Sequence, residues 1–288
     1  MKISNIKFGI QVEDVDYHSI DDAVTVRNFI GTKRIVVVKN PTPVPAKDLL
    51  TFYQNIGDVV AQEKEVVGSG VDGLHEFVRV KRNGLFTGAE DGELEWHCAG
   101  MNRNGAEDIV AIYMNKPGVD GGDTYFSDTQ TAYEDLDEET KEKIDGLKSK
   151  IVNYPEKMLV GDTFYKNVFA NEQTFKAFKD IDGIAAHTKQ TSRKNLVTTH
   201  PLNNKKGLHY PWSVIRGFAG IDKRESHDLY YKLKNHTLND KYVYKHVWDQ
   251  YDICLSDQHH SLHRRDAYDG DRELWRSGIW YRSENVTV

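Results

Sequence analysis

The pattern of hydrophobic and polar positions predicts strands that lie far apart in the sequence. Residues 33–40 (KRIVVVKN) form a β-branched run that is bounded by charges and followed by a proline-containing turn, as expected of a buried strand. Residues 108–118 (DIVAIYMNKPG) repeat this pattern, and residues 121–128 (GGDTYFSD) continue in extended form. Near the C-terminus, residues 252–265 (DICLSDQHHSLHRR) and 274–282 (LWRSGIWYR) predict two further extended segments. The sheet is therefore expected to pair distant parts of the chain.

Other segments have apolar residues at helical spacing. Residues 46–60 (AKDLLTFYQNIGDVV) place their large apolar side chains on one face, and Gly57 is expected to end this helix. Residues 131–154 predict one long amphipathic helix in which acids precede lysines, and residues 222–238 predict another helix. Residues 196–210 predict two short strands around a turn.

The order of these elements predicts an α+β fold. Strands at both ends enclose the helices, and the sequence contains no repeat, linker or low-complexity segment, so residues 1–288 are expected to form a single domain. The polar stretch at residues 186–196 has little periodicity. We therefore expect a lid insertion around residues 155–195.

Composition and charge narrow the classes of function. Of the 288 residues, 39% are hydrophobic and 28% are charged, which is typical of a globular protein. The formal net charge of -6 argues against binding of a nucleic-acid polymer, although not against a single nucleotide as ligand. No apolar run is long enough to span a membrane, and the N-terminal residues lack the apolar core of a secretion signal, so we expect a cytoplasmic protein. Cys98 and Cys254, the two cysteines, are expected to be free thiols.

Histidine is abundant, so a single histidine is weak evidence for a metal site. His97 stands out because it follows an aromatic residue and precedes a glycine-containing loop. His263 ends the segment DQHHSLH, in which strand alternation is expected to place it on the same face as Asp257 and His259. These two histidines are the best candidates for metal ligands.

Two other segments have chemistry that suits an anion. GGDT, residues 121–124, combines a tight glycine turn with the hydroxyl group of Thr124. RELWR places Arg272 and Arg276 four residues apart, and a guanidinium can bind a carboxylate through two parallel hydrogen bonds.

Taken together, these segments resemble the taurine dioxygenase family of iron(II)- and 2-oxoglutarate-dependent oxygenases. The resemblance extends over most of the chain, from Gly9 through THP at residues 199–201 to the histidine and arginines near the C-terminus. Gly121 follows His97 by 24 residues, which is the spacing of that family without a gap. The resemblance implies a double-stranded β-helix, or distorted jelly roll, with flanking helices.

The resemblance also implies roles for individual residues. His97 and His263 would be the iron ligands, and Arg276 would pair with the far carboxylate of 2-oxoglutarate, helped by Thr124. Arg272 would lie near the oxoacid or the substrate. The implied cofactors are Fe(II), 2-oxoglutarate and O2, and the implied reaction functionalises an unactivated C–H bond of a small polar molecule.

Ala99 departs from the family pattern. The family has an aspartate or glutamate two residues after the first histidine, which completes a triad of two histidines and one carboxylate. A methyl group cannot ligate iron, so the metal would have one more open position than usual, and a chloride there would preserve the local charge. Radical halogenases of the same superfamily have alanine or glycine at this position. The resemblance therefore implies chlorination, with chloride as a further ligand.

Three other interpretations of Ala99 remain. The protein could be a hydroxylase or desaturase in which water, or an acid such as Asp257 or Glu95, fills the position. It could be a relative that has lost iron and serves as a binding module, although the retained histidines and arginines have no chemical role there. Ala99 could also be an artificial replacement of an aspartate. Cys98 is expected to point away from the metal face, as a buried structural cysteine.

The substrate is expected to lie between two walls beside the metal strand. One wall would be formed by Trp96, Met101, Asn102 and Arg103, and the other by His209, Tyr210, Trp212 and Arg216. The arginines favour an anionic or zwitterionic molecule such as an amino acid, a sulfonate or a nucleotide. The sequence does not predict the oligomeric state.

Overall fold

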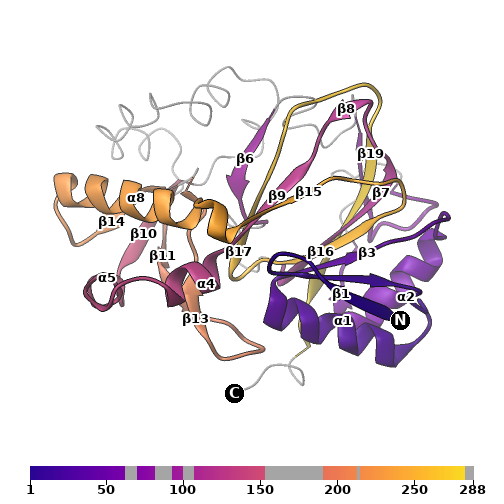
Figure 1. Ribbon diagram of the computed structural model, residues 1–288, viewed down its shortest axis with the longest axis horizontal. Helices are drawn as coiled ribbons and strands as arrows, with labels where there is room; N and C mark the ends of the chain where they lie inside the picture. The colour runs from indigo at the N-terminus through magenta and orange to yellow at the C-terminus, as the bar shows by residue number, and fades with distance from the viewer. Residues whose placement is uncertain (62–69, 82–92, 100–106, 153–190, 213–214, 283–288) are drawn as a thin grey trace.

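Two β-sheets form the centre of the protein in the computed structural model, which describes residues 1–61, 70–81, 93–99, 107–152, 191–212 and 215–282 (Figure 1). The larger sheet contains β1 (Lys2–Asn5), β2 (Ile10–Glu13), β3 (Ile35–Val38), β16 (Ile253–Asp257), β7 (Ile109–Lys116), β19 (Glu273–Trp280) and β4 (Asp58–Val59) in this order, and β5 (Val78–Lys81) also pairs with β19. The smaller sheet has the order β15 (Val243–His246), β9 (Thr124–Asp128), β17 (Ser261–Arg265) and β6 (Leu94–His97). As predicted, both sheets pair segments that are distant in the sequence.

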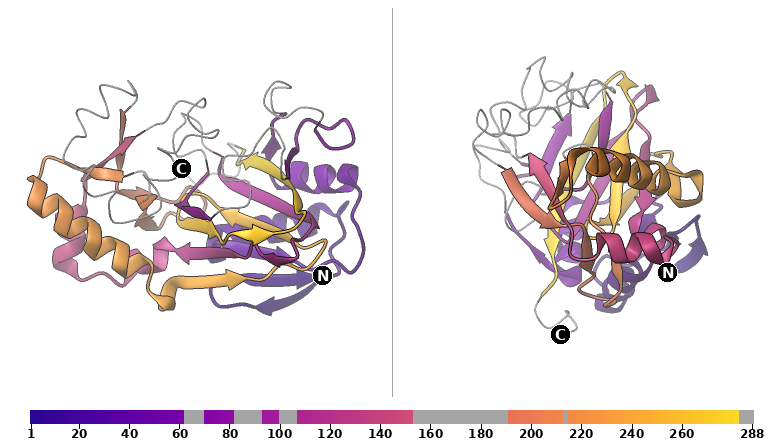
Figure 2. Two further views of the ribbon diagram at one scale, coloured as in Figure 1. Left: turned by 90° about the horizontal axis from the view of Figure 1, so that it is seen from above. Right: turned by 90° about the vertical axis from the view of Figure 1, so that its left-hand side faces the viewer.

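Shorter strands and the helices surround these sheets. The remaining strands are β8 (Asp120–Gly121), β10 (Lys148–Val152), β11 (Thr191–Asn195), β12 (Val197–Thr199), β13 (Lys206–Leu208), β14 (Ile215–Ala219) and β18 (Tyr268–Asp269). The helices are α1 (Ile20–Lys33), α2 (Ala46–Ile56), α4 (Thr129–Glu134), α5 (Glu138–Ile144), α8 (Lys223–Thr237) and the 3-10 helix η4 (Asp240–Tyr242). Figures 1 and 2 show α8 at the opposite end of the molecule from α1 and α2.

Strand alternation divides the buried side chains into three clusters. The inner cluster lies between the two sheets and includes Val37, Met114 and Leu274 of the larger sheet and Phe126 of the smaller sheet. A second cluster joins the other face of the larger sheet to α1 and α2. The third, called the outer cluster here, joins the other face of the smaller sheet to α8, β10 and β14, and contains Leu262. Residues that face the inner cluster are therefore enclosed by both sheets.

Most predicted elements are present. The runs at residues 33–40 and 108–118 form β3 and β7, and the periodic segment at 222–238 forms α8. Gly57 is the C-cap of α2, as expected. The mixture of helices and strands agrees with the predicted α+β class. Within the described residues, no helix combines the length and apolar character that a membrane crossing requires.

The long helix predicted for residues 131–154 is wrong. The structure forms α4, α5 and the strand β10 instead. Asp137 breaks the helix because its carboxylate accepts the backbone N–H of Thr140 and so caps a new helix. Gly146 then takes a positive φ of 72°, after which the alternating segment KSKIV pairs with β11 and β14. Local capping and sheet pairing therefore override the helical pattern.

Two other expectations also need correction. Residues 252–265 do not form one continuous strand, because the chain turns after Asp257 and enters the other sheet at Ser261. Asp257 and His259 therefore do not share a strand face with His263. Of the predicted lid at 155–195, residues 155–190 lie outside the described residues, and residues 191–195 form β11.

Candidate active site

The two candidate metal ligands, His97 and His263, lie side by side on neighbouring strands. They are direct partners in the register of β6 and β17, and their ring centroids are 4.2 Å apart. Trp96 and Leu262, which precede them, belong to the outer cluster, so alternation directs both histidines to the inner face. There the ring of His263 lies 6.3 Å from that of Phe126, centroid to centroid.

His263 has the properties of a metal ligand. Its side chain is buried, and its Nδ1 atom has no hydrogen-bond partner within the described residues. Burial lowers the pKa of His263, and His97 and Arg276 lower it further, so the imidazole is held in the neutral form that binds metals. No group of three or more histidine, cysteine or acidic side chains suited to a metal occurs in the described part of the chain. The buried, neutral imidazole of His263 beside His97 therefore fits a pair of metal ligands.

Gln258 holds the backbone at Ala99. Its Oε1 atom accepts the N–H of Ala99 at 2.7 Å, while its Nε2 atom donates to the carbonyl and hydroxyl oxygens of Ser256 at 3.0 and 2.9 Å. Gln258 is buried, and both ends of its amide are bonded. Ala99 is thus tied to the turn between β16 and β17, and its methyl group provides no metal ligand.

Asp257, one of the acids considered as a substitute ligand, is bonded elsewhere. Its Oδ1 atom hydrogen-bonds with Nε2 of His200 at 3.1 Å, its Oδ2 atom lies 3.5 Å from Nη1 of Arg34, and it accepts two backbone N–H groups of the following turn. Burial alone would raise the pKa of Asp257, but His200 and Arg34 outweigh burial and hold the pKa below its usual value. Asp257 therefore organises the turn that leads to β17. The side chain of Glu95, the other candidate, lies outside the described part.

A second part of the site surrounds the GGDT turn. Thr124 begins β9 and is buried, and its hydroxyl accepts the indole N–H of Trp248 at 2.9 Å. Arg272 is only 3% exposed, and its Nη2 atom donates to the carbonyl of Gly122 at 3.3 Å. Gly122 has a φ of 76°, and a Cβ there would lie 3.0 Å from Nε of Arg272. Glycine therefore gives the guanidinium room to lie against the turn.

Arg272 is a buried cation with no carboxylate ion pair among the described residues. Burial and the neighbouring Arg265 lower the pKa of Arg272 to about 10. Asp123, which acts weakly on this pKa, forms its ion pair with Lys245 at 2.8 Å. Arg272 lines a pocket of about 250 Å³ with Trp248 and with Gly121, Gly122 and Asp123 of the GGDT turn. Because an unmatched buried charge is costly, this pocket fits an anionic ligand.

Arg276 has a different environment. It lies two residues after Leu274 on β19, so alternation directs it to the same inner face. Its Nη2 atom donates to Oε1 of the buried Glu107 at 2.9 Å. A Cβ at Gly278 would lie 2.3 Å from Cγ of Glu107, so the glycine leaves the space that Glu107 occupies. Sequence reasoning missed Glu107, and the only signal for it was a glycine inside a strand pattern.

The predicted substrate walls are only partly described. Met101, Arg103 and the side chain of Arg216 lie outside the described part. Trp96, Tyr210 and Trp212 are buried in the outer cluster, on the face of the smaller sheet opposite His97. The hydroxyl of Tyr210 donates to a backbone carbonyl of α8 at 2.7 Å. The structure therefore places these three aromatic residues in packing, away from the histidine pair.

Both cysteines are free and buried, as expected. Cys98 packs in the outer cluster, where burial raises the pKa of its thiol to about 12. Cys254 packs in the inner cluster, and burial raises its pKa as well. Neither thiol is poised to act as a thiolate ligand.

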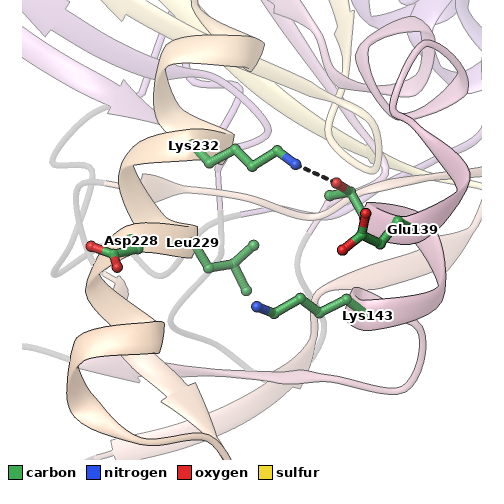
Figure 3. Close-up of a pocket in the computed structure, with 6 residues that line it drawn as sticks. Glu139, Lys143, Asp228, Leu229 and Lys232 are labelled. Atoms are coloured by element: carbon green, nitrogen blue, oxygen red, sulfur yellow. Dashed lines mark hydrogen bonds between the residues drawn. The ribbon is translucent and has the colours of Figure 1, made fainter.

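A separate surface pocket of about 170 Å³ lies between α5 and α8 (Figure 3). It is lined by Glu139, Thr140, Lys143, Asp228, Leu229 and Lys232. Lys232 donates to the hydroxyl of Thr140, and Lys143 pairs with Glu225 at 2.7 Å. The pocket contains no residue of the histidine pair or the GGDT turn, so it is not part of this site.

Comparison with known proteins gives one consistent result. Residues 2–277 match the model of the family described as taurine catabolism dioxygenase TauD, TfdA family. An alpha-ketoglutarate-dependent 2,4-dichlorophenoxyacetate dioxygenase from Cupriavidus pinatubonensis is 28% identical over 285 residues, which cover 94% of this chain and 93% of that protein. A dioxygenase of the same name from Burkholderia sp. is 28% identical over 159 residues, which cover 54% of this chain and 48% of that protein. The crystal structure of a taurine dioxygenase from Burkholderia xenovorans has a TM-score of 0.74 at 17% identity, covering 98% of this chain and 89% of that chain, so it shares the fold.

Proposed function

The chain belongs to the taurine catabolism dioxygenase TauD/TfdA family and is an iron(II)- and 2-oxoglutarate-dependent oxidoreductase, and we propose that it functionalises an unactivated C–H bond of a small polar molecule. The observation that carries this proposal is the His97–His263 pair on the inner face, next to Ala99. We take the two facing sheets as the distorted jelly roll of the family, and residues 1–288 as one domain.

Within this class, we propose halogenation as the reaction. Two histidines and a chelating 2-oxoglutarate leave the metal one more open position than the usual triad does. Asp257 is engaged with Arg34 and His200, so it does not fill that position. A chloride ion carries the same charge as the missing carboxylate. When bound, the iron and its cosubstrate supply the oxidising chemistry, and Ala99 leaves the place for the halide.

Hydroxylation is the second candidate reaction. The relatives named above are dioxygenases, and none of the comparisons supports halogenation or a chloride ligand. In this case water would take the position beside Ala99, and the retained histidines would serve an ordinary oxygenase.

We propose that Arg272 and Thr124 bind the far carboxylate of 2-oxoglutarate. The resemblance had suggested Arg276 for this role, but Arg276 already pairs with Glu107, whereas Arg272 is buried without an ion pair among the described residues. An incoming carboxylate would match the charge of Arg272 in the pocket that Arg272 and Trp248 line, and the Thr124 hydroxyl accepts a hydrogen bond from this Trp248.

The Arg276–Glu107 pair also bears on the substrate. Arg276 lies close enough to His263 to lower its pKa, so the pair stands near the proposed metal. A guanidinium whose charge is already matched by Glu107 attracts a lone carboxylate less than an unpaired one does. We therefore favour a zwitterionic substrate, such as an amino acid, over a sulfonate or a nucleotide.

One titration tests the proposed function without a known substrate. Anaerobic protein is titrated with Fe(II) and 2-oxoglutarate, with and without chloride, while the visible charge-transfer band is followed. We expect a band whose position and 2-oxoglutarate affinity depend on chloride. Ala99→Asp is the matched control, because a carboxylate should occupy the position and remove the chloride dependence.

Each other result has a defined meaning. A charge-transfer band that does not depend on chloride in either the unchanged protein or Ala99→Asp would contradict a halide site beside Ala99 and leave hydroxylation as the reaction. Absence of a band would overturn the oxygenase function and favour a binding module. Product analysis at saturating chloride, once a substrate is known, then separates chlorinated from hydroxylated products.

A further inference from the structure

Gln258 connects the two sheets next to the histidine pair. It belongs to the turn between β16 and β17, and its backbone N–H donates to the carbonyl of Asp108, just before β7, at 2.9 Å. Its side chain bonds to the backbone of Ala99, two residues after His97. One residue therefore joins the end of the larger sheet to the strand that carries a proposed metal ligand.

The partners of the Gln258 amide fix its orientation. The N–H of Ala99 can only donate and the carbonyl of Ser256 can only accept, so Oε1 faces Ala99 and Nε2 faces Ser256. The Gln258 residue is only 4% exposed. Because both ends of a buried amide are bonded, a different arrangement would leave buried polar groups without partners.

The strand that Gln258 holds lies at the edge of the smaller sheet. Among the described residues, β6 pairs with β17 alone, whereas β9 has a partner strand on each side. The register of β6 also shifts between the pairs His97–His263 and Leu94–Arg265, as at a β-bulge. An edge strand with an irregular register is held less firmly by backbone pairing than a central strand, so a side-chain contact at its end matters more.

The alternation of β6 continues as far as Ala99. Trp96 and Cys98 both pack in the outer cluster, so His97 and Ala99 lie on the opposite face. The hydrogen bond from Ala99 to Gln258 holds the chain in this extended path. It thereby keeps the imidazole of His97 and the methyl group of Ala99 on the inner face.

We propose that Gln258 is a positioning residue of the metal site, whose amide fixes the strand end that presents His97 and Ala99. Gln258 is not itself a proposed ligand and acts through that strand. This inference rests on the proposed function, because it assumes that His97 and His263 bind the metal. It predicts that metal affinity depends on a glutamine outside the histidine pair.

Gln130 provides a matched control. It is also buried, and both ends of its amide are bonded: Nε2 donates to Glu134 at 3.2 Å, and Oε1 accepts from Asn203 at 2.9 Å. Gln130 lies on α4, and these partners belong to neither the histidine pair nor the turn between β16 and β17. Gln130→Met therefore makes the same chemical change away from His97.

The test is titration of the metal-free protein with Co(II), whose ligand-field absorption reports both affinity and coordination geometry. We expect Gln258→Met to bind Co(II) about 10-fold more weakly and with a shifted spectrum, because residues that orient metal ligands typically contribute about 10- to 100-fold. Gln130→Met should bind like the unchanged protein. Gln258→Asn, which keeps an amide in the turn if Gln258→Met does not fold, should show the same loss because its side chain is too short to reach Ala99.

A His97→Ala background shows whether Gln258 acts through His97. If it does, Gln258→Met should cause no further loss of Co(II) affinity in that background, because the strand no longer presents a ligand. A full further loss would overturn positioning through β6 and assign the effect to the turn that leads to His263.

The remaining outcomes separate this inference from the proposed function. Unchanged affinity and spectrum in Gln258→Met and Gln258→Asn would overturn the positioning role, even if both variants unfold more easily. Equal losses in Gln258→Met and Gln130→Met would also overturn it, since the effect would then come from general destabilisation. Failure of the unchanged protein to bind Co(II) would instead overturn the proposed function itself.

Discussion

Two groups of buried histidines and charges lie close together on β16, β17 and their neighbours, and they differ in how their charges are matched. The Asp257 cluster consists of Arg34, Asp108, His200, Asp257 and His259. In it, Asp257 contacts both Arg34 and His200, and His259 lies 2.6 Å from Asp108. The inner-face group consists of His97, Thr124, His263 and Arg272.

In the inner-face group, two residues are incompletely matched within the described part of the chain. His263 has an unbonded Nδ1 atom, and Arg272 is buried without an ion pair. A buried cluster in which each charge has an opposite charge beside it stabilises one conformation of the turn. A buried charge without such a partner is retained although it lowers the free energy of unfolding. The difference teaches that His259, although it lies where histidines are most concentrated in the sequence, belongs to a structural cluster, whereas the proposed site contains the buried Arg272 without a carboxylate partner among the described residues.

Replacement of Asp257 should have the largest effect on stability. Asp257→Ala would leave Arg34 without its closest acid and release the backbone N–H groups of the turn, so we expect a loss of about 3–5 kcal/mol in the free energy of unfolding. Chemical denaturation followed by circular dichroism measures this loss. A loss below about 1 kcal/mol would mean that the cluster does not hold the turn.

His263→Ala should show the opposite behaviour. The variant loses one of two proposed metal ligands, so we expect the affinity for Fe(II) to fall by more than about 100-fold, while the unfolding free energy of the metal-free protein changes far less than in Asp257→Ala. Anaerobic dialysis with metal analysis measures the affinity. A variant that stays fully metallated would show that another of the histidines binds the metal.

Arg272→Met should affect cosubstrate binding more than stability. Loss of a buried, charge-assisted contact should weaken 2-oxoglutarate binding by about 10- to 100-fold, and the metal-free protein should become slightly more stable because an unmatched charge is removed. Titration of the charge-transfer band and thermal unfolding measure the two effects. If Arg276→Met alone caused the loss, the oxoacid would bind at Arg276 instead.

The pH dependence of unfolding should give the smallest effect and comes from the structural histidines. Burial lowers the pKa of His260 from 6.5 to about 3, so between these values the unfolded chain binds a proton that the folded chain does not. Stability contributed by the neutral ring is therefore present above pH 6.5 and falls by about 1 kcal/mol per pH unit as the pH decreases. His260→Gln, which can still bond to Thr198, should flatten the slope between pH 6.5 and 5. An unchanged slope would assign the acid sensitivity to other groups, such as His209, whose pKa burial lowers to about 4.

By itself, the sequence determined the class of elements and the identity of the histidine pair. Strong local patterns, such as the run in β3 and the periodicity in α2, fold as predicted because burial of one face is a local property of the segment. The spacing from His97 to the GGDT turn was specific evidence for the family, and the comparison with known proteins confirmed that family. Local rules failed where capping decided the outcome, as at Asp137 between α4 and α5.

Only the tertiary structure decided which charged groups are matched. Glu107 and Arg276 are far apart in the sequence, as are Asp257 and Arg34, and no periodicity pairs them. The environments of Arg272 and Arg276 differ because one lies against the GGDT turn and the other reaches a glycine-lined space. Matching of buried charge depends on the positions of all neighbours at once, and for that reason the roles of these arginines required the folded structure.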